Sequence, residues 1–383
     1  MRIRSFALLL LSLLLSHFAE AQLNNQALLQ TMPVVPQNAN QLRFSMYSFG
    51  FCKNNEYFNK IADGYTLFGY QLNPRLTYYP SANVRIDAGV FLWKDFGSGG
   101  YQDIVPTFTI KVQRANWALL FGTLEGNLNH GYIEPLYNFE RVINSRLENG
   151  AQYQLHTPGI NLDAWIDWAN MLYVGEDDQE QIHAGATAAI TLLRQEAKHT
   201  AGDSLLLTLP VQLTAQHKGG QIDASDLPLV TLLDVAAGLD LEKTYADAAL
   251  QRVYTKNYWV GYKDLSNEYL RRFTQGHGLY LNAGVDTKYS DVMLSYWHGR
   301  GYISELGGKL YQSVSTTYKN PGYVDEDRRL LILRLMKDFE LLDNLYLTLR
   351  LEPVMDLDEQ QIEFSNALYL TFDTDFFVAK PKH

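Results

Sequence analysis

The sequence predicts an all-β fold, a transmembrane antiparallel β-barrel of about sixteen strands. Three observations support this expectation: an amino-terminal export signal, segments of about ten residues in which apolar and polar side chains alternate, and connections that are short and long in turn. Roughly fourteen to eighteen strands satisfy the same pattern.

The amino terminus has the composition of a secretory signal peptide. Arg2 and Arg4 supply positive charge, residues 6–15 form an almost unbroken apolar run, and Ala19-Glu20-Ala21 provides the small-x-small cleavage pattern. This run is too short to span a bilayer as a stable helix, which argues against an uncleaved anchor. We therefore expect export, with residues 1–21 removed by a signal peptidase.

The composition suits a membrane barrel better than two or three soluble domains. Aromatic residues make up 13% of the chain, with 25 Tyr and 18 Phe, yet no later stretch approaches the ~18 apolar residues of a membrane helix. The single cysteine, Cys52, excludes an intramolecular disulfide. The formal net charge of −10 at pH 7 argues against nucleic acid as a partner.

Alternation of apolar and polar residues places the strands. In chain order, we expect them at residues 42–52, 65–80, 84–95, 102–114, 117–126, 149–157, 160–172, 180–194, 204–217, 229–241, 250–263, 278–289, 292–303, 329–339, 344–354 and 364–378. The pattern is clear in the fifteenth, where Leu345, Leu347, Leu349 and Leu351 share one face while Tyr346, Thr348, Arg350 and Glu352 share the other. A soluble β-sandwich also alternates, so this pattern alone does not decide the fold.

Connection lengths separate the barrel from the sandwich. Every second connection is short in most of the chain, at residues 81–83, 114–116, 157–159, 289–291 and 342–344, although 195–203 and 242–249 are less tight. The other connections are mostly long, and 127–148 and 304–328 are the longest. Short turns at one end and long loops at the other are typical of outer-membrane barrels, and a sandwich does not predict this asymmetry.

The last strand carries a family resemblance. Leu368, Leu370, Phe372, Phe376 and Val378 share one face, and Thr371, Asp373 and Asp375 the other. This resembles the aromatic-rich closing strand of Gram-negative, porin-like outer-membrane β-barrel proteins, although residues 379–383 extend beyond the usual terminal aromatic. The resemblance covers the mature chain as an architecture and names no subfamily.

That resemblance implies a location and partners. We expect a periplasmic amino-terminal segment at residues 22–40 and an outer-membrane barrel at 41–383. The implied partners are outer-membrane lipid and lipopolysaccharide, and the barrel-assembly machinery that inserts such proteins. A small polar solute or a polysaccharide is a further expected partner. The substrate and the oligomeric state are not determined by the sequence.

Aromatic residues lie mostly near the predicted strand ends. They are Phe49, Phe51, Tyr65, Phe91, Trp93, Trp117, Trp165, Trp168, Tyr258, Trp259, Tyr296 and Trp297. Their position favours girdles at the two membrane interfaces over ordinary core packing.

Charged residues on the polar faces are expected to point into the lumen. An Arg or Lys at the lipid midplane costs ~2–4 kcal/mol, so these side chains avoid the outer face. They are either a filter for permeating solutes or pairs that fill a narrow interior. The pore-lining candidates are Arg75, Arg85, Asp87, Lys111, Asp163, Asp167, Asp234, Asp240, Asp286, Lys288, Arg334, Asp338, Arg350, Glu352, Asp373 and Asp375.

The connection at residues 127–148 is the third long loop. In the sixteen-stranded porins that this architecture resembles, the third loop folds into the barrel and narrows the pore. A long loop rich in apolar residues is expected to be packed, either as such a constriction or as a lid on the rim. The constriction-loop candidates are His130, Glu134, Glu140, Arg141, Arg146 and Glu148.

Motifs for catalysis are missing from the sequence. It contains no His-Glu-x-x-His, no Cys-x-x-Cys, no Gly-x-Ser-x-Gly and no phosphate loop. We therefore expect no enzymatic activity, no catalytic residue, no cofactor and no metal site.

Three functions are weighed on this basis. The favoured one is a porin-like channel that passes small polar or saccharide solutes through a charged lumen. The alternatives are a closed structural or adhesive barrel and an outer-membrane enzyme that modifies lipid. Such an enzyme needs a His with a Ser or acidic partner on the lipid-facing side near one rim, and His183, His217 and His298 are candidates by residue type alone.

Overall fold

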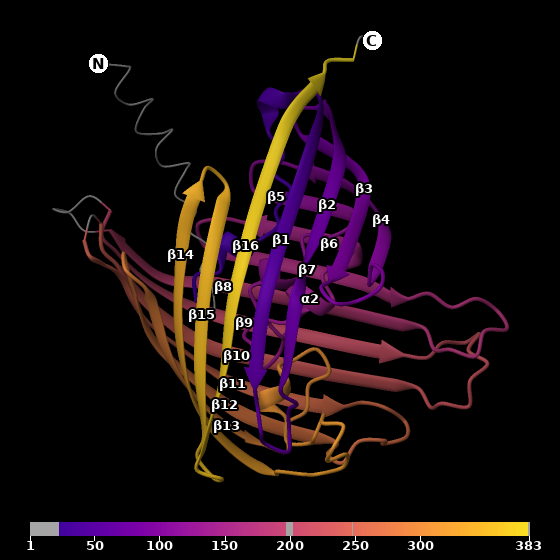
Figure 1. Cartoon of the computed structure of the whole chain (residues 1–383), viewed down its shortest axis with the longest axis vertical. Coiled ribbons are helices and arrows are strands. Elements are labelled where there is room, and N and C mark those ends of the chain that lie inside the picture. The colour runs from indigo at the N-terminus through magenta and orange to yellow at the C-terminus, as the bar shows by residue number, and fades with distance from the viewer. Residues whose placement is uncertain (1–22, 197–201, 247, 382–383) are drawn as a thin grey trace.

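Sixteen antiparallel strands close into a single barrel in the computed structural model, which describes residues 23–196, 202–246 and 248–381 (Figure 1). The expected signal peptide lies outside the described residues. Each strand pairs with its neighbours in the chain, and the first pairs with the last. The strands are β1 (Leu42–Glu56), β2 (Tyr65–Ser81), β3 (Val84–Asp95), β4 (Asp103–Gln113), β5 (Trp117–Thr123), β6 (Asn149–His156), β7 (Ile160–Asn170), β8 (Gln181–Glu196), β9 (Ser204–Lys218), β10 (Val230–Thr244), β11 (Leu250–Asp264), β12 (Gln275–Thr287), β13 (Asp291–Arg300), β14 (Asp327–Leu342), β15 (Leu345–Asp356) and β16 (Gln361–Ala379).

The predicted fold class is therefore confirmed, with a strand in each of the sixteen expected places. Strand β5 ends three residues earlier than predicted, at Thr123. There the chain leaves the wall, and the Leu124 amide donates to the Glu148 carbonyl 2.9 Å away, which closes the neck of the loop between β5 and β6.

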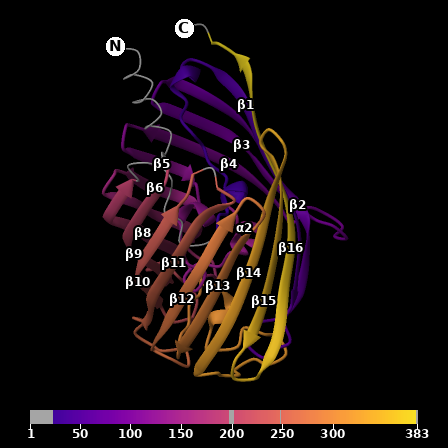
Figure 2. The same ribbon diagram turned by 90° about the vertical axis from the view of Figure 1, so that its left-hand side faces the viewer.

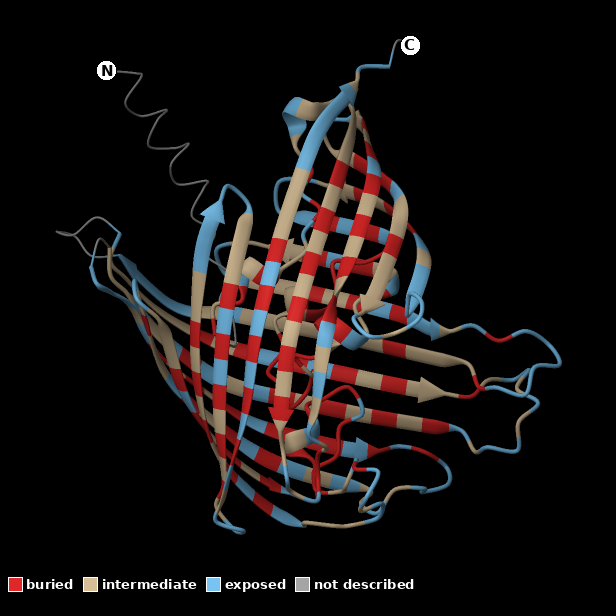
Figure 3. Cartoon of the chain, in the orientation of Figure 1, coloured by how far each residue is buried: buried red, intermediate tan, exposed pale blue. Residues whose placement is uncertain are grey.

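Burial alternates along each strand, as Figure 3 shows by its bands. In β9, Thr208, Gln212 and Thr214 are buried, whereas Val211 and Leu213 are exposed on the other face. Apolar side chains thus cover the outside and polar ones point inward, which is the reverse of a soluble protein and suits a wall surrounded by lipid.

The two ends of the barrel differ. The start of β1, the end of β16 and the short connections lie at one end, here called the short-turn end (Figures 1 and 2). The long connections lie at the other, here called the long-loop end. No helix among the described residues is long and apolar enough to cross a bilayer.

Three segments fill the lumen. The plug loop (residues 124–148) contains η3 (Asn127–His130) and α2 (Arg141–Asn144). The amino-terminal segment (residues 23–41) contains η1 (Gln26–Leu28) and η2 (Pro36–Asn38), and the cap loop (residues 301–326) contains η4 (Lys309–Tyr311). Each of these segments carries buried side chains.

Hydrogen bonds from several sides of the wall hold the plug loop inside. Gln71 of β2 donates to the Ile143 carbonyl at 2.6 Å. On another side of the barrel, the Ile133 amide donates to Gln212 of β9 at 3.0 Å. The cap loop joins it, because the Tyr302 hydroxyl donates to the plug-loop carbonyl of Pro135 at 3.0 Å.

Half of the expected girdle aromatics belong to the interior instead. Trp117, Trp168 and Trp259 are exposed on the outer wall, in agreement with a girdle. The girdle prediction is wrong for six other aromatic residues. Their side chains point inward in the alternation, and they pack in the two main apolar clusters or against the lumen. That group is Phe49, Phe51, Phe91, Trp165, Tyr258 and Trp297.

Candidate functional site

Most of the predicted pore-lining residues are buried in the lumen. Asp338 and Asp373 are only partly buried, near the short-turn end. Lys288 and Asp375 are exposed, which corrects their assignment: Lys288 lies in the turn beyond β12, and Asp375 pairs with Arg43 at 2.8 Å near the end of β16. The buried candidates are Arg75, Arg85, Asp87, Lys111, Asp163, Asp167, Asp234, Asp240, Asp286, Arg334, Arg350 and Glu352.

Many of these buried charges form ion pairs. Arg85 Nε lies 2.7 Å from Asp87 Oδ2, and Lys111 Nζ lies 2.8 Å from Glu125 Oε1. Such pairing agrees with the interpretation in which the charges fill the interior. Buried charges are tolerated when each has a partner and hydrogen bonds, since an unpaired one carries a large desolvation cost.

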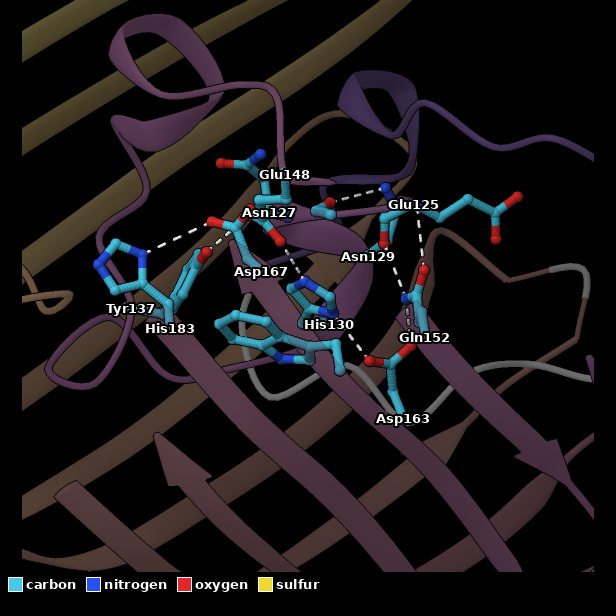
Figure 4. Close-up of polar contacts among 12 residues, drawn as sticks. Glu125, Asn127, Asn129, His130, Tyr137, Glu148, Gln152, Asp163, Asp167 and His183 are labelled. Atoms are coloured by element: carbon cyan, nitrogen blue, oxygen red, sulfur yellow. Dashed lines mark hydrogen bonds and ion pairs between the residues drawn. The ribbon is translucent and has the colours of Figure 1, made fainter. Parts of the chain in front are cut away.

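His130 anchors the plug loop to the wall (Figure 4). Its Nε2 lies 2.7 Å from Glu148 Oε2, and its Nδ1 lies 2.8 Å from Asp163 Oδ1 on β7. The indole of Trp165 stacks on the imidazole at 4.7 Å between ring centroids, and the Tyr137 hydroxyl donates to Glu148 at 2.6 Å. Both ring nitrogens are therefore occupied and the ring face is covered.

Charge explains the protonation state of this anchor. Burial disfavours the imidazolium, yet Glu148 and Asp163 outweigh this effect and raise the pKa of His130 to about 10. Burial also disfavours the Glu148 carboxylate, and the imidazolium outweighs it and lowers the pKa of Glu148 to about 2. A His that is already protonated and clamped between two carboxylates cannot serve as a general base, so this cluster is structural.

A pocket opens at the long-loop end, here called the loop-end pocket. Strands β1, β2, β14 and β15, the plug loop and the cap loop all contribute to its lining. On one side, Arg350 Nη2 lies 2.7 Å from Glu134 Oε1 and 2.8 Å from Glu352 Oε1. Arg334 also contacts both carboxylates, and the Tyr311 hydroxyl of the cap loop donates to Glu134 at 2.9 Å.

On the other side of this pocket, the lining residues Lys53 and Glu140 contact each other, and Lys53 also contacts a hydroxyl behind the lining. Lys53 Nζ donates to Ser365 Oγ at 2.8 Å and lies 3.4 Å from Glu140 Oε1 of the plug loop. Asn55 Nδ2 donates to the same Glu140 oxygen at 2.6 Å, and the Tyr65 hydroxyl donates to its second oxygen. A possible nucleophile, a base and an orienting carboxylate thus stand in a row, which is the arrangement of covalent hydrolases.

Strand register explains why Ser365 lies next to residues that line the pocket. It stands opposite Asn55 of β1 and Glu352 of β15, which both line the pocket. Its own neighbours on the inward face of β16, Glu363 and Ala367, are buried as well. The Tyr57 phenol also hydrogen-bonds Ser365.

Sequence reasoning missed Ser365, Lys53 and Asn55. Their inward position follows from extending the alternation: the face that carries Thr371 in β16 also carries Ser365, and the face that carries Phe49 in β1 also carries Lys53. What could not be read from the sequence is that the plug loop brings Glu140 to the same place.

The remaining candidates lie elsewhere. Arg141 packs over the Tyr137 ring, and Arg146 reaches toward the short-turn side of the plug loop. His183 is buried beside Asp167 at 3.6 Å, and His217 contacts the Thr231 hydroxyl at 2.9 Å. His298 pairs with Asp327 at 2.7 Å and is partly exposed, outside the loop-end pocket. Among the described residues, no three His, Cys, Asp or Glu side chains are placed to hold a metal ion.

A closed sixteen-stranded antiparallel barrel with an apolar outer face has the porin-like fold of outer-membrane β-barrel proteins, as predicted. Within that class, the family described as Lipid A 3'-O-deacylase-type matches residues 34–381, and the chain belongs to this family. The family is named for an enzymatic activity. This overturns the expectation that the protein is not an enzyme, which rested on missing linear motifs.

Other comparisons concern the fold alone. OprD from Pseudomonas aeruginosa is 12% identical with a TM-score of 0.48, over 91% of this chain and 98% of that chain. OccK11 (OpdR) from the same organism is 12% identical with a TM-score of 0.48, over 88% of this chain and 96% of that chain. A loop L8 deletion mutant of OmpT from Vibrio cholerae is 9% identical with a TM-score of 0.48, over 87% and 99%. No curated protein matches the sequence.

Proposed function

We propose that the protein hydrolyses an acyl ester of lipid A or a closely related acylated saccharide at the long-loop end of the barrel. The observation that carries this proposal is the row of Ser365, Lys53 and Glu140 beside the loop-end pocket. Family membership supplies the substrate class, because the family is described by the deacylation of lipid A.

The chemistry follows from the order of the groups. Ser365 Oγ attacks the acyl carbonyl carbon while its proton passes to a neutral Lys53 amine, and a tetrahedral oxyanion forms. The ester bond to the sugar then breaks, and Lys53 returns the proton to the leaving sugar oxygen. Water attacks the acyl-serine with Lys53 again as base, which releases the fatty acid and restores Ser365.

Neighbouring groups have positioning roles in this scheme. Glu140 orients the amine, since its carboxylate is fixed from three sides by Lys53, Asn55 and Tyr65. The Asn55 amide and the Tyr57 phenol lie beside Ser365 and are the donors that we assign to the oxyanion, because pre-positioned donors stabilise such intermediates.

The location of the site suits a lipid of the outer leaflet. The barrel wall carries its apolar side chains on the outside, and we place the long-loop end at the cell surface, where lipopolysaccharide resides. Insertion there requires export through the signal peptide and the barrel-assembly machinery, as the sequence predicts.

Mass spectrometry of lipid A tests the proposal. Cells that express the wild-type chain should contain lipid A that has lost the mass of one acyl group, and Ser365→Ala should restore the parent mass. Ser45→Ala is the matched control, because Ser45 is equally buried on β1 but bonds only Thr77, at 2.8 Å. Unchanged lipid A in wild-type cells, or an active Ser365→Ala variant, would contradict the assignment.

Passage of a small polar or saccharide solute is a second candidate function. The observation that favours it is a second pocket, so the plug loop lines two separate spaces within one barrel. Planar-bilayer recordings should give small or absent steps for the wild type and large steps after deletion of residues 128–144. Silence from a correctly folded deletion variant would exclude this function.

A further inference from the structure

The second pocket, here called the turn-end pocket, lies between strands β2 to β5, the plug loop and the amino-terminal segment, and Asp87 of β3 is among its lining residues. It contains a cation without a partner. Arg75 of β2 lines this pocket and is only 3% exposed, yet its Nε has no hydrogen-bond acceptor. Within the described part of the chain, its guanidinium has no ion pair within 4.0 Å.

The carboxylates nearest to Arg75 are committed to other groups. Asp87 receives both Nε and Nη2 of Arg85, at 2.7 and 2.8 Å, together with the Thr77 hydroxyl at 2.5 Å. Glu125 is paired with Lys111 at 2.8 Å. Asp373 attracts Arg75 only from beyond ion-pair distance. The positive charge in this pocket therefore exceeds the negative charge that is free to neutralise it.

A second guanidinium points into the same pocket from the plug loop. Arg146 donates from Nε to Gln71 at 2.6 Å and to the Val142 carbonyl at 2.9 Å, and its guanidinium also hydrogen-bonds the Tyr47 phenol, while its buried Nη2 has no partner among the described residues. The side chain lies over the Phe49 ring at 4.6 Å, which fixes its direction. Burial lowers the pKa of the Arg146 guanidinium, and the Tyr47 phenol offsets this only in part.

Two buried guanidinium groups with unused N–H donors fit one class of ligand. Arginine forks bind phosphate and carboxylate oxygens through paired, charge-assisted hydrogen bonds, and phosphate offers enough oxygens for two forks at once. A bound oxyanion also removes the cost of burying unpaired cations.

We propose that the turn-end pocket is a binding site for a small phosphate-type oxyanion, held between Arg75 of the barrel wall and Arg146 of the plug loop. The amino-terminal segment completes the pocket with Gln30 and Met32. The bound anion therefore ties the wall, the plug loop and the amino-terminal segment together and stabilises the closed lumen. This site is separate from the proposed hydrolytic site, and neither depends on the other.

Isothermal titration calorimetry of the folded, detergent-solubilised protein with inorganic phosphate at constant chloride tests the site. The wild type should bind one phosphate per chain, and Arg75→Gln and Arg146→Gln should each weaken binding at least tenfold. Arg252→Gln is the control for nonspecific attraction, because Arg252 is a lumen arginine outside this pocket and pairs with Asp286 at 2.6 Å.

The folding of each variant is checked by gel electrophoresis. A folded barrel changes its mobility when the sample is heated, and each variant must keep this change. Should Arg75→Gln fail to fold, the loop variant Arg146→Gln carries the test, because it leaves every strand intact. Absence of saturable phosphate binding by the wild type overturns the proposal. Equal weakening in Arg252→Gln, or unchanged affinity in a folded Arg75→Gln or Arg146→Gln variant, overturns it as well.

Discussion

His130 and Lys53 are both buried nitrogen bases, each in contact with a carboxylate of the plug loop, and their surroundings differ in one group. His130 lies between two carboxylates, Glu148 and Asp163. Lys53 lies between one carboxylate, Glu140, and the hydroxyl of Ser365. The first arrangement is closed and can only hold the loop in place. The second contains a nucleophile, so the Lys53 amine can take up and return the proton of Ser365.

The largest effect is expected from Lys53→Met. This change removes the proposed base while keeping a side chain of similar length, so the rate of acyl-ester hydrolysis should fall by ~10³-fold or more. Single-turnover assays of purified protein on lipid A in mixed micelles measure the loss. A folded Lys53→Met variant with more than a tenth of wild-type activity would show that the amine is not the base.

His130→Gln should change stability rather than chemistry. Removing the imidazolium leaves Glu148 and Asp163 buried without their cation, which typically costs ~3–5 kcal/mol of folding free energy. Thermal unfolding followed by tryptophan fluorescence should show a clear drop in midpoint. His217→Gln is the control, because His217 contacts only the Thr231 hydroxyl and its loss is expected to cost about 0.5 kcal/mol or less. Equal midpoints for the two variants would contradict the anchoring role of His130.

Glu140→Gln should have a smaller effect on catalysis than Lys53→Met. The amide keeps the contact with Tyr65 but loses the charge that orients Lys53, so kcat should fall about 100-fold with little change in KM. The pH profile should shift as well, which a merely structural role would not produce. An unchanged pH profile in a folded variant would show that Glu140 does not orient Lys53.

The pH dependence of stability tests the contribution of His130 and Glu148. The pKa of His130 is raised from 6.5 to about 10, so its stabilisation is complete below pH 6.5 and is lost as the pH rises through about 10. The pKa of Glu148 is lowered from 4.5 to about 2, so its stabilisation is complete above pH 4.5 and is lost as the pH falls through about 2.

Together the two groups predict full stabilisation by the anchor between pH 4.5 and 6.5. The unfolding midpoint of the wild type should be higher at pH 5.5 than at pH 10, by more than in His130→Gln. An identical pH response of the two proteins would place the titrating group elsewhere.

The strands of the barrel wall could be predicted from the sequence, but only part of the candidate site could. The alternation in β14 and β15 is regular, and Arg334, Arg350 and Glu352 are buried on the face that it assigns to the interior. Lys288 and Asp375 were misplaced because alternation says which face a residue occupies and not where the lumen ends. The girdle assignment of Trp165 and Trp297 failed for a related reason, since an aromatic near a strand end fits either face equally well.

The sequence by itself determined the sixteen strands, the face of most strand residues and the asymmetry between short turns and long loops. These features depend on neighbours one or two positions apart, where the pleat of a strand and the cost of charge in lipid act directly. Only the tertiary structure decided which charges meet in the lumen. Glu140 and Ser365 are far apart in the chain, and they approach the same lysine because the plug loop folds inward and the last strand closes against the first.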